Sequence, residues 1–296
     1  MPSIETNVVP LIVWVSKNSR KSPNVTTTAI LPPRLKLTAP FADVDLVLGH
    51  SDLKVFILGS PRSGTSITYH AMQEVFGLPG RGESHVVPIF QRMIHQFYHY
   101  ALEFNQSDHV LAQTLDTSSL RSHMADYVRR FYREQFKGDR WVDKTPGAEA
   151  ILGAEFILEI FPTARFLLMR RNGIEIVQSA RKKFSVSFED ACSGWANCME
   201  SAGDLRARRA PVLELDQFEL TNSPDVAAGK IAAYLGRPDK EIELASFFVE
   251  RRVDKTSDHD WSRRITLADV AWSDDQRRHF RAVCGPWMER SGYPLE

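Results

Sequence analysis

The sequence predicts an α/β fold in which helices flank a central, mainly parallel sheet. Short, continuous apolar runs lie at residues 55–58, 165–169 and 211–215, as expected for strands that are buried on both faces of such a sheet. Longer segments between and after these runs have helical periodicity, and strands that alternate with helices are typical of parallel sheets. A length of 296 residues allows one or two domains, and we expect a single domain over residues 51–296.

The helical segments follow from apolar residues that recur every three or four positions. The predicted helices cover residues 66–76, 87–105, 118–136, 147–161, 175–184, 188–208, 225–235, 239–250 and 274–290. The last helix begins after Ser273, and Gln276 completes a capping box in which each side chain bonds to the backbone N–H of the other residue.

We interpret residues 1–50 as an N-terminal extension, because residues 16–40 are rich in Ser, Thr, Pro and Asn and read as irregular chain. The early apolar run at 8–15 contains Pro10 and is far shorter than the ~20 residues that span a bilayer. We therefore expect no transmembrane segment. A secretory signal has a basic start, then an apolar run and then a cleavage site of small residues, and the early residues do not show these features in that order.

The composition excludes several classes of protein. Hydrophobic residues make up 43% and charged residues 25%, which is ordinary for a globular protein and excludes disordered and collagen-like chains. Lys+Arg and Asp+Glu both number 37, so no overall charge attracts DNA, RNA or an anionic membrane, although a local basic pocket is possible. The three cysteines are too few for a disulfide framework or a four-ligand zinc site. We expect a reducing compartment, the cytoplasm.

A glycine-rich loop follows the first strand. Residues 59–66 read Gly-Ser-Pro-Arg-Ser-Gly-Thr-Ser and precede a helix, so backbone N–H groups and the helix N-terminus can surround a phosphate. The loop of nucleotide triphosphatases reads G-x-x-x-x-G-K-[ST], and Thr65 stands at its lysine position. Arg62 offers a guanidinium group at another point of the anion. The alternative is a strand-to-helix turn whose glycines serve sterics only.

These residues resemble the sulfotransferases that use 3′-phosphoadenosine 5′-phosphosulfate (PAPS). Residues 61–66 match the family's P-[RK]-[SG]-G-T-[ST] loop throughout. The resemblance implies a P-loop sulfotransferase-type fold. It also implies that the 5′-phosphosulfate is held by Arg62, Ser63, Gly64, Thr65 and Ser66.

The family's second signature is a strand that ends in arginine, with a serine eight residues later. Arg171 and Ser179 have this spacing, although Arg170 precedes Arg171 and Gly173 stands where the family commonly has proline. The resemblance implies that Arg171 and Ser179 bind the 3′-phosphate that distinguishes PAPS from ATP. Such an arginine lies at the carboxyl end of its strand, where open α/β sheets bind ligands. The alternative is a solvated helix entrance.

Two shorter segments resemble one branch of the family, which includes tyrosylprotein sulfotransferases and many bacterial enzymes. Residues 82–88, Gly-Glu-Ser-His-Val-Val-Pro, are similar to its G-E-[ST]-x-x-x-P segment, and residues 143–146, Asp-Lys-Thr-Pro, to its [EN]-K-[TD]-P segment. The resemblance implies that Glu83 is the catalytic base and that Lys144 reaches the transferred sulfuryl group. Without it, Glu83 reads as an exposed loop carboxylate and Lys144 as a surface charge.

His85 competes with Glu83 for the role of base, because histidine is the commonest general base. We favour Glu83, since the resemblance assigns that role to the family's glutamate. We expect a carboxylate beside Arg62 and Lys144 to remain ionised. His85 then falls to the acceptor site.

The helix predicted at 87–105 has two candidate faces. Met93, Phe97, Tyr100 and Phe104 form an apolar stripe that we assign to the core. The opposite side, with Ile94, His95, Tyr98 and His99, is a candidate wall of an acceptor pocket. His95 and His99 stand four residues apart, as metal ligands can, but no third ligand is evident and we predict no metal. Residues 86–136 form a predicted helical insertion, where family members tend to vary their acceptor site.

Near the C-terminus, residues 260–264 read Asp-Trp-Ser-Arg-Arg and resemble the tryptophan-basic segment of the same branch. The resemblance implies that Arg263 or Arg264 completes the 3′-phosphate site. It covers residues 53–184 well and 255–296 loosely.

The sequence thus predicts an enzyme that moves the sulfuryl group from PAPS to an acceptor hydroxyl, or less readily to an amine, without a metal. It specifies neither the oligomeric state nor the acceptor, for which a small molecule, a glycan or a peptide all fit. Two alternatives are a P-loop small-molecule kinase, which the missing loop lysine disfavours, and a nucleotide-binding module without catalysis.

Overall fold

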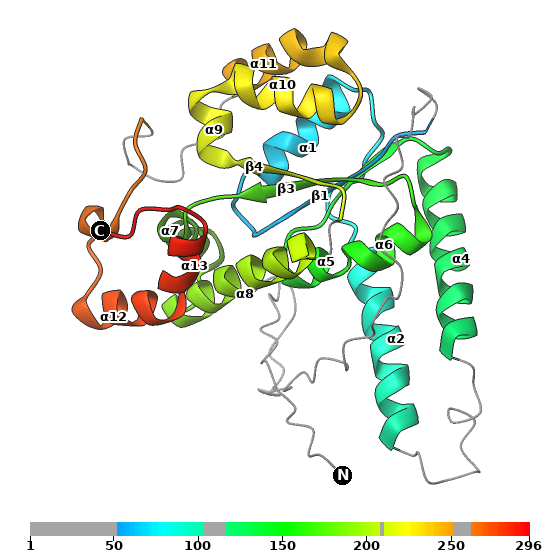
Figure 1. Cartoon of the computed structure of the whole chain (residues 1–296), viewed down its shortest axis with the longest axis horizontal. Helices are drawn as coiled ribbons and strands as arrows, with labels where there is room; N and C mark the ends of the chain where they lie inside the picture. Colours follow the sequence, from blue (N-terminus) through cyan, green and yellow to red (C-terminus); the bar gives the residue numbers. More distant parts are fainter. Residues whose placement is uncertain (1–51, 104–116, 208–209, 252–261) are drawn as a thin grey trace.

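A four-stranded, all-parallel sheet forms the centre of the computed structural model, which describes residues 52–103, 117–207, 210–251 and 262–296 (Figure 1). Its strands are β1 (Lys54–Gly59), β2 (Trp141–Lys144), β3 (Arg165–Arg170) and β4 (Val212–Asp216), in the order β2-β1-β3-β4. The predicted fold class and the three predicted strands are confirmed. The predicted extension at 1–50 lies outside the described residues.

The residues of β1 alternate between two apolar layers, as the two-residue period of a strand requires. Val55 and Ile57 pack into one layer, and Phe56 and Leu58 into the other. The first layer contains α1 (Thr65–Glu74), α10 (Pro224–Tyr234) and α11 (Glu241–Glu250). The second contains α4 (Thr117–Phe136), α5 (Ala148–Leu152), α6 (Ala154–Ile160) and part of α8 (Phe188–Ala207). Helices therefore cover both faces of the sheet (Figure 1).

A third apolar cluster joins α8 to the C-terminal part of the chain. It contains α7 (Gly173–Phe184), α12 (Asp274–Val283) and α13 (Gly285–Arg290), with Trp195, Phe280 and Met288 at its centre. The last residues are tied in as well, because the N–H of Leu267 donates to the carbonyl of Leu295. The described C-terminal residues thus pack against the helices that follow β3.

Helix α2 (Val86–Glu103) lies beside α4 and extends away from the sheet (Figure 1). The predicted core stripe is wrong for Met93, which is 53% exposed, whereas Ile94 on the predicted pocket side is only 4% exposed and packs in the core. Val87 and Gln91 approach Gly153, between α5 and α6, and this contact turns the Ile94 side inward. The side chain of Tyr100 and all of Phe104 lie outside the described residues.

Several predicted helices are divided in the structure. The segment 147–161 forms α5 and α6, which are separated at Gly153. The segment 274–290 forms α12 and α13, because Pro286 lacks the N–H that a continuous helix needs. A 3₁₀ turn, Pro238–Lys240, precedes α11. The capping box of Ser273 and Gln276 is confirmed. Two short elements were not predicted, α9 (Gln217–Asn222) and a 3₁₀ turn at Leu267–Asp269.

The neighbouring strands β1 and β3 lead into helices on opposite faces of the sheet. Helix α1 follows β1 into the first layer, whereas α7 follows β3 and packs with α8. Open α/β sheets bind ligands in the crevice at such a switch point, at the carboxyl ends of the strands. The glycine-rich loop and Arg171 both lie there. No helix in the described ranges has the length and apolar character that a membrane crossing needs.

Candidate functional site

The glycine-rich loop joins β1 to α1 and is shaped by its own hydrogen bonds. Gly59 has a φ of +136°, and a Cβ atom there would lie 2.3 Å from the carbonyl oxygen of Met169 on β3, so only glycine fits. Ser63 is fully buried, and its hydroxyl (2.7 Å) and its N–H (3.2 Å) both donate to the carbonyl of Ser60. The donors of Ser63 thus serve the shape of the loop.

The N-terminus of α1 has no capping side chain. Gly64 occupies the N-cap with a φ of +93°, no side chain caps the first backbone N–H groups, and no acidic residue lies in the first turn. Side chains of Asn172, Asp216 and Ser273 cap α7, α9 and α12, whereas α5, α6, α10, α11 and α13 lack a side-chain cap, as α1 does. The first N–H groups of a helix lack partners within the helix and carry its positive dipole end. The start of α1 is therefore suited to an anion.

Two arginines meet at this loop. Arg62 Nε donates to Ser179 Oγ at 3.0 Å, and Arg171 Nη1 donates to the carbonyl oxygen of Arg62 at 3.0 Å. The pKa of Arg62 is lowered, first by burial and then by the nearby charge of Arg171. A nearby positive charge disfavours the charged form of an arginine, and a bound anion would offset this repulsion. Arg171 and Ser179 therefore both contact Arg62.

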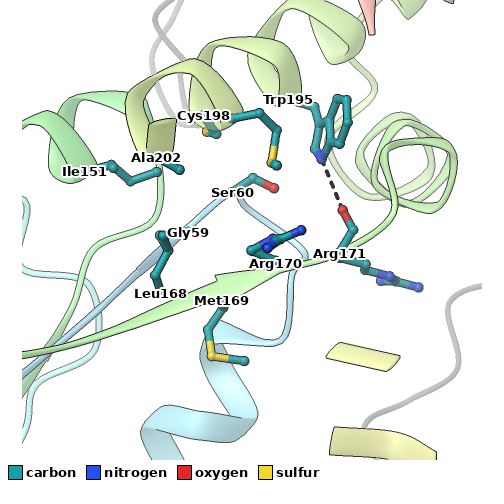
Figure 2. Close-up of a pocket in the computed structure, with 11 residues that line it drawn as sticks. Gly59, Ser60, Ile151, Leu168, Met169, Arg170, Arg171, Trp195, Cys198 and Ala202 are labelled. Atoms are coloured by element: carbon teal, nitrogen blue, oxygen red, sulfur yellow. Dashed lines mark hydrogen bonds between the residues drawn. The ribbon is translucent and has the colours of Figure 1, made fainter. Parts of the chain in front are cut away.

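The two consecutive arginines at the end of β3 have different surroundings. Arg171 is 5% exposed and bonds to Glu175 at 3.2 Å. Arg170 instead bonds to Glu214 at 2.8 Å and to the carbonyl of Ser291 at 3.0 Å. Figure 2 shows the two side chains leaving the strand in different directions. Arg171, not Arg170, therefore faces the loop.

Trp195 of α8 fixes the backbone at this point. Its Nε1–H donates to the carbonyl of Arg171 at 3.2 Å (Figure 2). A Cβ atom at Gly173 would lie 2.9 Å from the Trp195 ring, so this ring accounts for a glycine where the resembling family commonly has proline. The cavity drawn in Figure 2, which is lined by Gly59, Ser60 and both arginines, has a volume of about 10 Å³. It holds about one water molecule and is too small for a ligand.

Glu83 lies between Lys144 and His85. Its Oε1 is 3.0 Å from Lys144 Nζ, and its Oε2 is 3.3 Å from His85 Nε2. The hydrogen bond from His85 and then Lys144 lower the pKa of Glu83 to about 2, against the effect of partial burial. The same hydrogen bond raises the pKa of His85. Glu83 is therefore ionised at neutral pH, as expected. Of its two expected neighbours, Lys144 contacts it, whereas Arg62 bonds to Ser179 instead.

Lys144 connects Glu83 to the loop. Its Nζ donates to the hydroxyl of Ser66 at 3.2 Å and lies 5.9 Å from the centre of the Tyr69 ring. Tyr69 OH in turn accepts from the N–H of Gly82 at 2.7 Å. Helix α1 thus holds both the lysine and the segment before Glu83. Tyr69 was not predicted, because it lies in no motif. Asp143 and Glu175 were not predicted as site residues either, although they lie next to Lys144 and four residues after Arg171.

The histidines of α2 are separated from Glu83 by the length of the helix. At 1.5 Å per residue, His95 and His99 lie roughly 14 and 20 Å along the axis from Val86. The side chain of Tyr98 lies outside the described residues. His85 alone of the predicted acceptor residues contacts Glu83 in the described part of the chain. No group of three or more His, Cys, Asp or Glu side chains in the described ranges is arranged to hold a metal ion.

Both C-terminal arginines are paired with carboxylates. Arg263 bonds to Asp269 at the surface. Arg264 bonds to Asp216 at 3.1 Å and lies between the rings of Phe218 and Tyr293, whose centres are 4.7 and 5.0 Å away. Asp216 is the last residue of β4, so Arg264 reaches the edge of the sheet that carries the site. Residues 260 and 261 lie outside the described ranges.

Comparisons with known proteins identify the family. A family model described as "Sulfotransferase family" matches residues 54–241. A curated protein of Aquifex aeolicus (strain VF5), named "Uncharacterized protein", is 25% identical over 223 residues, which is 71% of this chain and 29% of that protein. The chain therefore spans less than a third of the length of the curated relative that it matches.

Solved structures share the fold. Sulfotransferase STF9 from Mycobacterium avium has a TM-score of 0.50 and 12% identity, over 83% of this chain and 78% of that one. The sulfotransferase domain of the Synechococcus PCC 7002 olefin synthase has a TM-score of 0.47 and 18% identity, over 83% of this chain and 97% of that domain. At such low identity the similarity to STF9 supports the fold alone.

Proposed function

This chain belongs to the sulfotransferase family, and from that premise we propose that it transfers the sulfuryl group of PAPS to an acceptor hydroxyl, or less readily to an amine. One observation carries the proposal. The uncapped start of α1, Arg62 and Arg171 meet at one loop, Lys144 bonds to Ser66 at the end of that loop, and Glu83 contacts Lys144. An anion site and a carboxylate in contact with it are what sulfuryl transfer needs.

The donor is proposed to lie across the ends of β1 and β3. The first N–H groups of α1, together with Arg62 and Ser66, would bind the 5′-phosphosulfate. Arg171 and Ser179 would bind the 3′-phosphate, and the bond between Arg171 and Glu175 fixes the guanidinium group for that contact. Arg264 lies beyond β3 at the end of β4 and is the better candidate for a third contact, because Arg263 is paired at the surface.

In the proposed reaction, Glu83 accepts the proton of the acceptor hydroxyl while the oxygen of that hydroxyl attacks the sulfur atom of PAPS in line. The bond between sulfur and the phosphate oxygen breaks, and the product PAP leaves with its electron pair. Lys144 and Arg62 stabilise the charge that grows on the leaving oxygen. A Glu83 carboxylate with a pKa of about 2 is a weak base while His85 and Lys144 hold it. We expect Lys144 to move to the sulfuryl oxygens when the donor binds, which raises that pKa.

The acceptor is proposed to approach on the exposed side of Glu83 and His85, whose side chains are 44% and 52% exposed. A small molecule, a glycan or a peptide would fit this open approach. Contact with His95 or His99 requires an acceptor that extends roughly 14 Å or more along α2. A cytoplasmic location stays a prediction. The three cysteines, whose small number led to that prediction, are free and buried.

The test is to incubate the protein and an extract of candidate acceptors with PAPS or with ATP, each with magnesium or with EDTA. Sulfuryl and phosphoryl adducts have nearly equal masses, so high-resolution mass analysis or a radiolabelled sulfur donor is needed. We expect a sulfuryl adduct from PAPS that EDTA does not suppress, because positive side chains neutralise the charge that magnesium neutralises in phosphoryl transfer. A phosphoryl adduct that requires magnesium would favour a kinase, and no adduct a binding module.

A further inference from the structure

A buried carboxylate lies directly behind Glu83 and Lys144. Asp143 of β2 is 3% exposed and precedes Lys144 in the chain. It accepts hydrogen bonds from three hydroxyls: Ser84 Oγ at 2.5 Å, Thr145 Oγ1 at 3.2 Å and Tyr132 OH in a short contact. Burying a carboxylate is costly unless donors surround it, so these bonds account for its presence among apolar neighbours.

Two of the three hydroxyls also hold the backbone next to Glu83. Thr145 Oγ1 accepts from the N–H of His85 at 3.3 Å, and Ser84 Oγ accepts from the N–H of Val86 at 3.3 Å. A hydroxyl has one proton and two lone pairs, so each can donate to Asp143 and still accept from the backbone. Tyr132 bonds to Asp143 from α4, and its OH also lies 3.3 Å from Ser84 Oγ. Because both hydroxyls donate their one proton to Asp143, neither has a proton left for a bond between them, and Tyr132 makes no described bond to the backbone of this segment.

The held segment has an unusual conformation. His85 has a φ of +51°, the left-handed region that residues other than glycine rarely adopt. This conformation turns the chain from Glu83 into the first turn of α2. A strained backbone of this kind persists only where its surroundings hold it, and the bonds to Ser84 and Thr145 flank it on both sides.

We propose that Asp143 is a positioning residue, which holds the Glu83 carboxylate against Lys144 through the hydroxyls of Ser84 and Thr145. Asp143 and Lys144 share one short strand, so the same carboxylate orders the lysine's strand and the glutamate's loop. The inference rests on the proposed function, in which Glu83 is the base and Lys144 stabilises the sulfuryl group. The competing explanation is that the three hydrogen bonds serve stability alone.

Matched single substitutions separate the two explanations, because each removes one hydroxyl from the same carboxylate. Ser84→Ala and Thr145→Val remove the hydroxyls that hold the Glu83 segment, and Tyr132→Phe removes the one that does not. We expect the first two to lower kcat about tenfold or more, with the Kd for PAP changed less than about twofold. Tyr132→Phe should lower Tm while kcat falls less than about threefold. Ser84→Thr, which keeps the hydroxyl, should retain kcat.

A second readout does not depend on activity. The His85 imidazole resonance, assigned from its loss in His85→Gln, reports the contact between His85 and Glu83 when it is titrated by NMR. We expect Ser84→Ala to lower the pKa of His85 and Tyr132→Phe to leave it unchanged.

The two proposals can fail separately. If the wild type transfers no sulfuryl group but the two variants show the expected His85 titrations, the proposed function is refuted and the positioning of Glu83 stands. An active wild type in which Ser84→Ala keeps both its kcat and its His85 titration would overturn the role of Asp143. The role of Asp143 is also overturned if Ser84→Ala, Thr145→Val and Tyr132→Phe all lower kcat, each by an amount that follows its loss in Tm.

Discussion

At the scale of single residues, the charged side chains of the site are each held by a hydrogen bond or an ion pair with a neighbouring side chain. Glu83 is held by Lys144 and His85, and Arg171 by Glu175. Each partner sets an orientation as well as a charge, since a hydrogen bond requires a direction. In the proposed reaction, the basicity of Glu83 therefore depends on which of Lys144 and His85 stays in contact when a donor and an acceptor bind.

The Glu83→Gln variant tests the assignment of the base. Gln keeps the size and hydrogen-bonding capacity of Glu but removes its basicity, so we expect kcat to fall by ~10²-fold or more, with little change in PAP affinity. His85→Asn should cost much less. Steady-state kinetics give kcat for both variants, and titration with PAP gives their PAP affinity. The reverse order, with Glu83→Gln nearly active and His85→Asn inactive, would make His85 the base and leave the donor site unaffected.

The pair of Glu83 and His85 also predicts a pH dependence of stability. The pKa of His85 is raised from 6.5, so its contribution is complete below pH 6.5 and is lost as the pH rises through the folded-state value. The pKa of Glu83 is lowered from 4.5 to about 2, so its contribution is complete above pH 4.5 and is lost as the pH falls towards 2. Both contributions are therefore complete only between pH 4.5 and 6.5.

We expect the difference in Tm between the wild type and Glu83→Gln to be largest in this window, and small because both side chains are half exposed. Thermal melts of the two proteins from pH 3 to 9, in steps of about one unit, would measure it. A difference that keeps growing above the His85 titration would contradict the pairing, since a neutral imidazole attracts the carboxylate less.

At the scale of elements, the close approach of β1 and β3 places the loop. The parallel pairing sets Gly59 opposite Met169, and the loop crosses the end of β3 because no side chain stands between them. The start of α1 then faces the side chains that follow β2 and β3. The proposed anion site thus depends on three strand ends in register, and not on the loop alone.

The substitution Gly59→Ala tests this packing. The new Cβ would lie 2.3 Å from a backbone oxygen at a φ of +136°, so we expect a loss of roughly 3 kcal/mol or more in the free energy of unfolding. Gly77→Ala is the matched control, because Gly77 also has a positive φ, +61°, but has no atom within 4 Å of such a Cβ. It should cost only about 1–2 kcal/mol. Equal losses in denaturant unfolding would contradict the role of the close approach.

At the scale of the whole molecule, a ligand that binds only the folded chain stabilises all of it. A ligand at one hundred times its Kd adds ~2.7 kcal/mol to the free energy of unfolding. If Arg171 and Ser179 bind a 3′-phosphate, PAP should raise Tm far more than ADP does, because ADP lacks that group. Thermal shift measurements with both nucleotides at equal concentration test this expectation.

Two neighbouring arginines supply the control for this measurement. Arg171→Ala should remove the preference for PAP, whereas Arg170→Ala, which loses its bonds to Glu214 and Ser291, should lower Tm but keep the preference. Equal shifts from PAP and ADP in the wild type would refute the 3′-phosphate assignment. So would an Arg171→Ala protein that still prefers PAP.

What the sequence determined lies within short stretches of chain. The run from β1 through the loop to α1, and the capping box at Ser273, were predictable because their hydrogen bonds join residues a few positions apart. The membership in the sulfotransferase family was predictable for the same reason, since its motifs are local. The strand β2 was harder to identify, because it has four residues of which two are charged.

Only the tertiary structure decided which distant residues meet. The distance of 3.0 Å between Arg62 and Ser179 joins residues 117 positions apart, and the choice between Arg170 and Arg171 depended on Glu214, Ser291 and the loop. The buried face of α2 was set by its contact with the turn at Gly153, which selected Ile94 over Met93, although the periodicity allowed both. Local patterns specify elements, but non-local packing selects which of their faces and side chains are buried together.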